Sequence, residues 1–399
     1  MNFVIFSLIY LSILRVLYIP LFGDLSVIVS GAVSVIFGLI LLFKFKVDNS
    51  TLFIIPYSFL LFFISIFQKY ESFFDIFISF FETLTPFIVI GVISSSNFKR
   101  YFNKNIVFFK KGIIFLILIL LLGHALNLLG FPLGDLGNVA LVSDLQDKFF
   151  TNTRVSSFVG TSGPYSLCIS FLLISLQILY PKFLPTIFLF GTLILLLSFS
   201  RLGLATFIIF NFTKFIQYSI GIFTRQNLKI RKNSFFYLVF AISLIFIIIN
   251  LYYESISLLY TRFMDGFDFV NDAGNVDRIS RFKQLVFEIK EDNFINILIG
   301  DGTGRTSRFL QAYQGESQLG KIYVEWGLIG LSLAIFWLLD ISNILKLKGN
   351  QIILDINTYS FPIFFSLIFS LLFIQSFTSA PVFISMIFPI MTMNYRFIK

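Results

Sequence analysis

The sequence predicts an all-α integral membrane protein with about twelve transmembrane helices. Of its 399 residues, 57% are hydrophobic and only 13% are charged, and the mean hydropathy is +0.89. Soluble domains contain roughly 45–50% apolar and about 25% charged residues, so this composition excludes a soluble globular protein. Twelve spans of about 20 residues would use about 240 residues and leave about 160 for loops.

Twelve apolar runs, separated by polar stretches, are the expected spans. They fall at 3–22, 25–43, 51–67, 73–95, 106–130, 163–180, 183–199, 202–222, 234–252, 322–344, 357–376 and 380–395. Pro181 and Pro185 crowd the boundary between the sixth and seventh runs, and Pro381 and Pro389 are expected to bend the last one. The first run has no basic leader and no small-residue cleavage site, so we expect it to be retained as a span.

The placement of lysine and arginine predicts cytoplasmic termini. With the N-terminus inside, the inner loops hold 16 of these residues, and the short outer connections hold 4. This excess fits the positive-inside rule for a multi-pass protein of the bacterial cytoplasmic membrane. The net charge of +9 is therefore a topology signal, and its scattered placement argues against a nucleic-acid partner.

The expected organisation is one transmembrane domain, 1–399, with two extracytoplasmic loops at 131–162 and 253–321. The chain has one cysteine, Cys168, and one histidine, His124. An intrachain disulfide and a His-rich metal site are therefore excluded, and we expect no metal. His124 lies deep in an apolar run, where a hydrogen-bonded packing role is the favoured interpretation.

The larger outer loop carries a predicted amphipathic helix at 277–292, lying on the membrane or on the bundle. Arg278 falls within its apolar stripe and Arg281 at the edge. Two guanidiniums at a membrane surface suit a lipid diphosphate, because each can bind phosphate oxygens in a bidentate manner. The alternatives are snorkelling to lipid headgroups or a salt bridge to Glu288.

Two further arginines belong to the same outer side. Arg154 lies in a Gly/Ser-rich stretch before the sixth run, and Arg201 lies between the seventh and eighth runs. A charge near the hydrocarbon core costs about 2.5–3.5 kcal/mol on insertion scales, so such an arginine either has a partner or snorkels to the interface.

Residues 299–305, Ile-Gly-Asp-Gly-Thr-Gly-Arg, form a glycine-rich run that ends in Arg305. It matches neither a Walker A loop nor a dinucleotide-binding fingerprint. A plain turn is favoured over a backbone nest for an anion.

Further on, Glu316 is expected outside the tenth span and Glu325 within its first turns. Either acid suits general-base or ion-pair work; the alternatives are a solvated loop acid for Glu316 and an ion pair with a bundle arginine for Glu325.

Asp75 and Glu82 are seven residues apart in the fourth run and so share one helix face, with Arg15 available in the first run. Buried acids of this kind occur in proton- and ion-coupled transporters. A structural ion pair is the interpretation we favour.

Together these motifs resemble the Wzy-type O-antigen polymerase family, within the wider group of O-antigen polymerases and ligases. The resemblance covers the topology of the whole chain and, locally, Arg154–Pro164, Ser198–Arg201 and 275–330. In the last segment its residues are Arg278, Arg281, the Gly300–Gly304 turn, Glu316-Ser317 and Glu325 with Gly327 and Gly330.

The resemblance implies a GT-C-like membrane glycosyltransferase without a cofactor. Such an enzyme moves a growing glycan from undecaprenyl diphosphate onto a new lipid-linked repeat unit, as in lipopolysaccharide biosynthesis. Its expected partners are these repeat units and membrane lipid, with dependence on a chain-length regulator left open. The expected roles are as follows: catalysis by Glu316 as base with Arg278 and Arg281; substrate binding by Arg154, Arg201, Arg305, Tyr323 and Glu325.

Two alternatives remain. Ligases of the wider group carry a histidine roughly where Glu316 stands, and the outer segments of this chain have none, which favours a polymerase. A lipid-linked oligosaccharide flippase would be expected to have two related halves and short loops on both sides, and neither feature is visible here.

Overall fold

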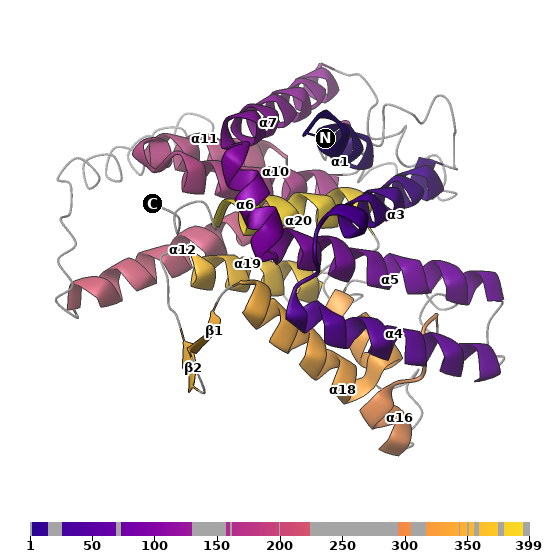
Figure 1. Cartoon of the computed structure of the whole chain (residues 1–399). Coiled ribbons are helices and arrows are strands. Elements are labelled where there is room, and N and C mark those ends of the chain that lie inside the picture. The colour runs from indigo at the N-terminus through magenta and orange to yellow at the C-terminus, as the bar shows by residue number, and fades with distance from the viewer. Residues whose placement is uncertain are drawn as a thin grey trace, which may run out of the picture.

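The computed structural model describes residues 2–14, 26–68, 73–129, 157–159, 162–198, 200–223, 294–304, 317–342, 344–348, 351–354, 359–373 and 379–393. Within these residues the chain forms a bundle of helices (Figure 1). Its α-helices are α1 (Asn2–Ile13), α3 (Ser26–Lys44), α4 (Asn49–Gln68), α5 (Phe73–Ser94), α6 (Ser96–Lys104), α7 (Ile106–Leu128), α10 (Ser162–Leu179), α11 (Leu184–Leu197), α12 (Arg201–Phe223), α16 (Phe294–Ile299), α18 (Gln318–Ile341), α19 (Ser360–Phe373) and α20 (Ala380–Met393).

The helical class is confirmed, and a helix lies at every predicted apolar run except 234–252, which is outside the described residues. Among the described residues, four segments are long and apolar enough to cross a membrane: Asn49–Phe67, Ile76–Ser94, Ile106–Asn127 and Gln318–Ile341. A fifth candidate is the bent pair formed by α10 and α11. The chain is thus a membrane protein, whereas twelve spans and a GT-C-like arrangement stay predictions.

The chain bends sharply between the sixth and seventh runs, where Pro181 and Pro185 lie. A short 3₁₀ helix, η3 (Pro181–Phe183), separates α10 from α11, and the two segments around it meet at 110°. Pro181 cannot donate a backbone hydrogen bond, and its ring clashes with the preceding turn, so α10 ends before it. In the last helix the prolines do not end the helix. Pro381 is the second residue of α20, and Pro389 lies inside α20, which continues to Met393.

The centre of the bundle is α20, all of whose residues are buried. A helix that is apolar on every side is buried either in a protein core or in lipid, and here the neighbouring helices cover it. Its neighbour α10 also packs against α12, and there Ser170 Oγ donates to the Gly203 carbonyl at 2.7 Å. A Cβ at Gly203 would collide with the backbone of Ser166, so this contact depends on small residues.

A short helix and a two-stranded hairpin were not foreseen. The short helix α6 begins at the N-cap Ser95 and buries Phe98 and Phe102 while exposing its charged face. After α18, strands β1 (Leu345–Lys348) and β2 (Gln351–Leu354) pair as an antiparallel hairpin, with Leu345 opposite Leu354. The hairpin is a small addition to the predicted all-α architecture.

Candidate functional site at the break in helix α18

Two predicted site residues, Tyr323 and Glu325, lie on α18, where Tyr323 is half-buried and Glu325 is fully buried. Arg201 is the first residue of α12, and its side chain is outside the described part of the chain. Five other predicted site residues lie outside the described residues: Arg154, Arg278, Arg281, Arg305 and Glu316. The predicted helix at 277–292 lies there too.

Helix α18 contains a sharp break at Gly327. The helix begins after Ser317, whose side chain accepts a hydrogen bond from the Gly320 amide at 3.0 Å. At Gly327 the backbone has φ 65° and ψ −167°, a conformation essentially restricted to glycine. A break of this kind removes intrahelical hydrogen bonds, so carbonyls just before it need other donors.

The glycine-rich turn after α16 supplies two of these donors. The Asp301 amide donates to the Val324 carbonyl at 2.9 Å, and the Gly302 amide donates to the Glu325 carbonyl at 3.1 Å. Because both amides are used within the protein, the structure favours the plain turn over an anion nest. Gly300, with φ 99°, lies so close to α18 that a Cβ there would collide with the Glu325 backbone.

Helix α4 supplies the third donor through Tyr57. The Tyr57 hydroxyl lies 2.9 Å from the Ile299 carbonyl and 2.7 Å from the Trp326 carbonyl, so one proton is shared between two acceptors. Trp326 also stacks on Phe87 of α5, with ring centroids 5.4 Å apart. Figure 1 shows α16 beside α18 and α4. Helices α4, α5, α16 and α18 therefore meet around the break.

Charged side chains gather at the same place. Lys321 is fully buried on α18, and its Nζ lies 3.9 Å from Glu82 Oε2 of α5. Glu82 also interacts electrostatically with Glu325, and Asp301 and Thr303 of the glycine-rich turn are buried. Burying charges among apolar helices is expensive unless they are paired, and such clusters in membrane proteins commonly serve function.

Glu82 forms an ion pair with Lys321, whereas Arg15, the partner suggested by the sequence, and the side chain of Asp75 lie outside the described residues. Sequence analysis missed Lys321. A signal was present, because Lys321 and Glu325 are four residues apart and so share a helix face. The prediction for His124 is also confirmed: its Nδ1 lies 2.8 Å from the Tyr165 hydroxyl, and both side chains are buried.

In the described part of the chain, no three His, Cys, Asp or Glu side chains form a group that could hold a metal ion. Fold and site together define a helical membrane protein with a largely buried charge cluster at a broken helix. No family model matches the chain, and neither the curated proteins nor the solved structures contain a match.

Proposed function

We propose that this protein is a membrane glycosyltransferase that polymerises a surface polysaccharide of the O-antigen type. The observation that carries the proposal is the group formed by the buried Lys321 and Glu325 and the partly exposed Glu82, next to the Gly300–Gly304 turn. Lys321 and Glu325 lie within the segment 275–330, which bears the strongest resemblance to the polymerases, and Glu82 joins them from α5. By the positive-inside rule the group belongs to the outer end of the bundle, where lipid-linked repeats would be present.

In the proposed reaction a sugar hydroxyl of the new repeat attacks the anomeric carbon of the donor glycan. The bond from that carbon to the diphosphate oxygen breaks, and undecaprenyl diphosphate leaves with the electron pair. Glu316 takes the proton from the attacking hydroxyl. Charge that develops on the leaving diphosphate is stabilised by Arg278 and Arg281, and electrostatic stabilisation of this kind is commonly the largest catalytic contribution.

The remaining residues bind the substrates. Arg154 and Arg201 neutralise the diphosphates of donor and acceptor, and Arg305 shapes the sugar site. Tyr323, which is half-buried on α18 near the break, contacts the acceptor glycan, whereas the fully buried Glu325 supports the site from within the bundle. The clamp made by Tyr57 and the glycine-rich turn holds this part of α18 in place.

The decisive experiment is reconstitution of the purified protein with undecaprenyl-diphosphate-linked repeat units as the sole substrate. A ladder of products differing by one repeat, with release of undecaprenyl diphosphate, is expected. If glycan were transferred only when lipid A-core is added, the protein would be a ligase and not a polymerase. Movement of lipid-linked sugar across proteoliposomes without any reaction would identify a flippase instead.

A further inference from the structure

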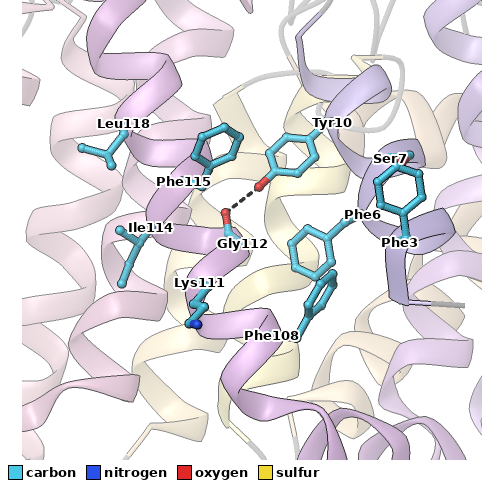
Figure 2. A pocket seen from close by; sticks show the side chains of 10 residues that line it. All are labelled: Phe3, Phe6, Ser7, Tyr10, Phe108, Lys111, Gly112, Ile114, Phe115 and Leu118. Carbon is cyan, nitrogen blue, oxygen red and sulfur yellow. Dashed lines mark hydrogen bonds between the residues drawn. The ribbon is translucent and has the colours of Figure 1, made fainter.

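A groove of about 550 Å³ lies between α1 and α7 on the surface of the bundle (Figure 2). Its lining is mainly aromatic and aliphatic and includes Phe6, Phe115 and Leu118. Lys111 is the charged residue among those that line it. The size is within the range of sites for small organic ligands, which are typically 300–1,000 Å³ and mostly apolar with a few polar groups.

The groove is built into the contact between the two helices. The Tyr10 hydroxyl of α1 donates to the Gly112 carbonyl of α7 at 2.8 Å, as Figure 2 shows. The Phe6 ring lies where a side chain at position 112 would be, so glycine is needed for this approach. Phe115 and Leu118 nevertheless remain more than half exposed, at 57% and 58%. The groove is therefore preformed and open along one side.

The surroundings of Lys111 select an anionic ligand. Lys111 is exposed, and so are Arg100 and Lys104 on the preceding helix α6. The sequence from 96 to 128 contains no aspartate or glutamate. Basic residues next to an apolar crevice in a membrane protein attract the headgroups of anionic lipids.

The spacing along α7 matches the layers of a phospholipid. Lys111 lies five residues after the helix start at Ile106, which is about 7.5 Å along the axis. Leu118 is a further seven residues on, about 10 Å deeper. A lysine near a helix end reaches the headgroup level with its ammonium group, whereas Leu118 is at the depth of acyl chains.

We propose that this groove binds one acyl chain of an anionic phospholipid whose phosphate contacts Lys111. The acyl chain would lie across Phe115 and Leu118, which are farther along α7 from Lys111 than the Tyr10–Gly112 contact. This proposal is independent of the glycosyltransferase function, because it rests on the α1–α7 groove and not on the cluster at α18.

The test uses Phe115→Trp protein in lipid nanodiscs and quenching by brominated phospholipids. Brominated phosphatidylglycerol should reach half-quenching at about a fivefold lower mole fraction than brominated phosphatidylcholine, the preference that one basic residue contributes near a membrane surface. The native Trp326 and Trp337 are buried, and their signal is subtracted with unsubstituted protein. Leu118→Trp serves as a second reporter if Phe115→Trp folds poorly.

Control variants distinguish lipid bound in the groove from lipid of the surrounding bilayer. A tryptophan in place of the exposed Phe63 on α4 should be quenched equally by both lipids. In the Phe115→Trp background, Lys111→Gln should abolish the preference, and Lys182→Gln, which removes an exposed lysine of η3, should preserve it. Equal quenching of Phe115→Trp by both lipids would overturn the proposal. So would a preference that survives Lys111→Gln, or weak quenching by both lipids because a second copy covers the groove.

Discussion

At the scale of single residues, Lys321 and Glu82 have unequal environments. The Lys321 side chain is 1% exposed, whereas that of Glu82 is 41% exposed. Removing the acid leaves a buried ammonium without this partner, while removing the lysine leaves a carboxylate that can still contact solvent or lipid headgroups. The two halves of the ion pair should therefore differ in their effect on stability.

We predict that Glu82→Gln destabilises the protein more than Lys321→Met. The expected loss for Glu82→Gln is on the order of 1–3 kcal/mol, because the buried Lys321 ammonium loses the negative charge that compensates it. Lys321→Met should cost less, since it removes the charge that is expensive to bury. The fraction of monodisperse protein that remains after heating in detergent measures both. A larger loss for Lys321→Met would contradict the prediction.

The proposed catalytic residues call for a separate test. Arg278→Ala and Glu316→Gln should each lower polymer formation by at least about 100-fold, the scale of a lost general base or charge-stabilising group. Protein levels should stay at those of the unsubstituted chain. The matched control is Arg225→Ala, an arginine predicted on the cytoplasmic side, which should polymerise normally. Full-length polymer from Glu316→Gln would remove Glu316 as the base.

At the scale of elements, the break in α18 depends on glycine. A Cβ at Gly327 would collide with the Leu298 carbonyl and the Gly300 amide, and the backbone there is in a region that other residues avoid. We predict that Gly327→Ala lowers the free energy of unfolding by at least about 1–3 kcal/mol. It should also lower glycan transfer, because Glu325 lies two residues before the break.

A matched control exists in α3. Gly31 has open space around its would-be Cβ, so Gly31→Ala should leave stability unchanged or raise it by up to about 1 kcal/mol through helix propensity. Denaturation of the two variants side by side in detergent makes the comparison. Equal stability of Gly327→Ala and Gly31→Ala would show that the break is not required for folding.

Helix positions were predictable from the sequence, whereas the contacts of the site were not. A backbone in lipid must satisfy its own hydrogen bonds, so each long apolar run predicts a helix. The pairing of Lys321 with Glu82 depends instead on which helices become neighbours, and one sequence does not encode that directly. The glycines at 300 and 327 were visible as a pattern, but their mutual contact follows only from the packing of α16 on α18.

At the scale of the whole molecule, the bent α10–α11 pair bears on the topology. If the pair returns to the side from which it came, positions 152 and 201 lie together outside and Lys182 lies inside, as the positive-inside rule predicts. We predict that a membrane-impermeant maleimide labels an Asn152→Cys variant in intact spheroplasts. A Lys182→Cys variant should react only after permeabilisation. The reverse pattern would invert the proposed orientation and place the cluster at α18 on the cytoplasmic side.

The lone cysteine gives this protein a built-in reporter. Cys168 is fully buried on α10, with its thiol donating to the Pro381 carbonyl of the central helix α20 at 3.3 Å. Thiol reagents should therefore not react with the folded native protein. Cysteines can then be introduced for labelling without first replacing Cys168. Conversely, a fluorophore that becomes fluorescent on reacting with a thiol should label Cys168 only after α10 separates from α20. Its fluorescence during heating therefore measures the unfolding of the bundle centre.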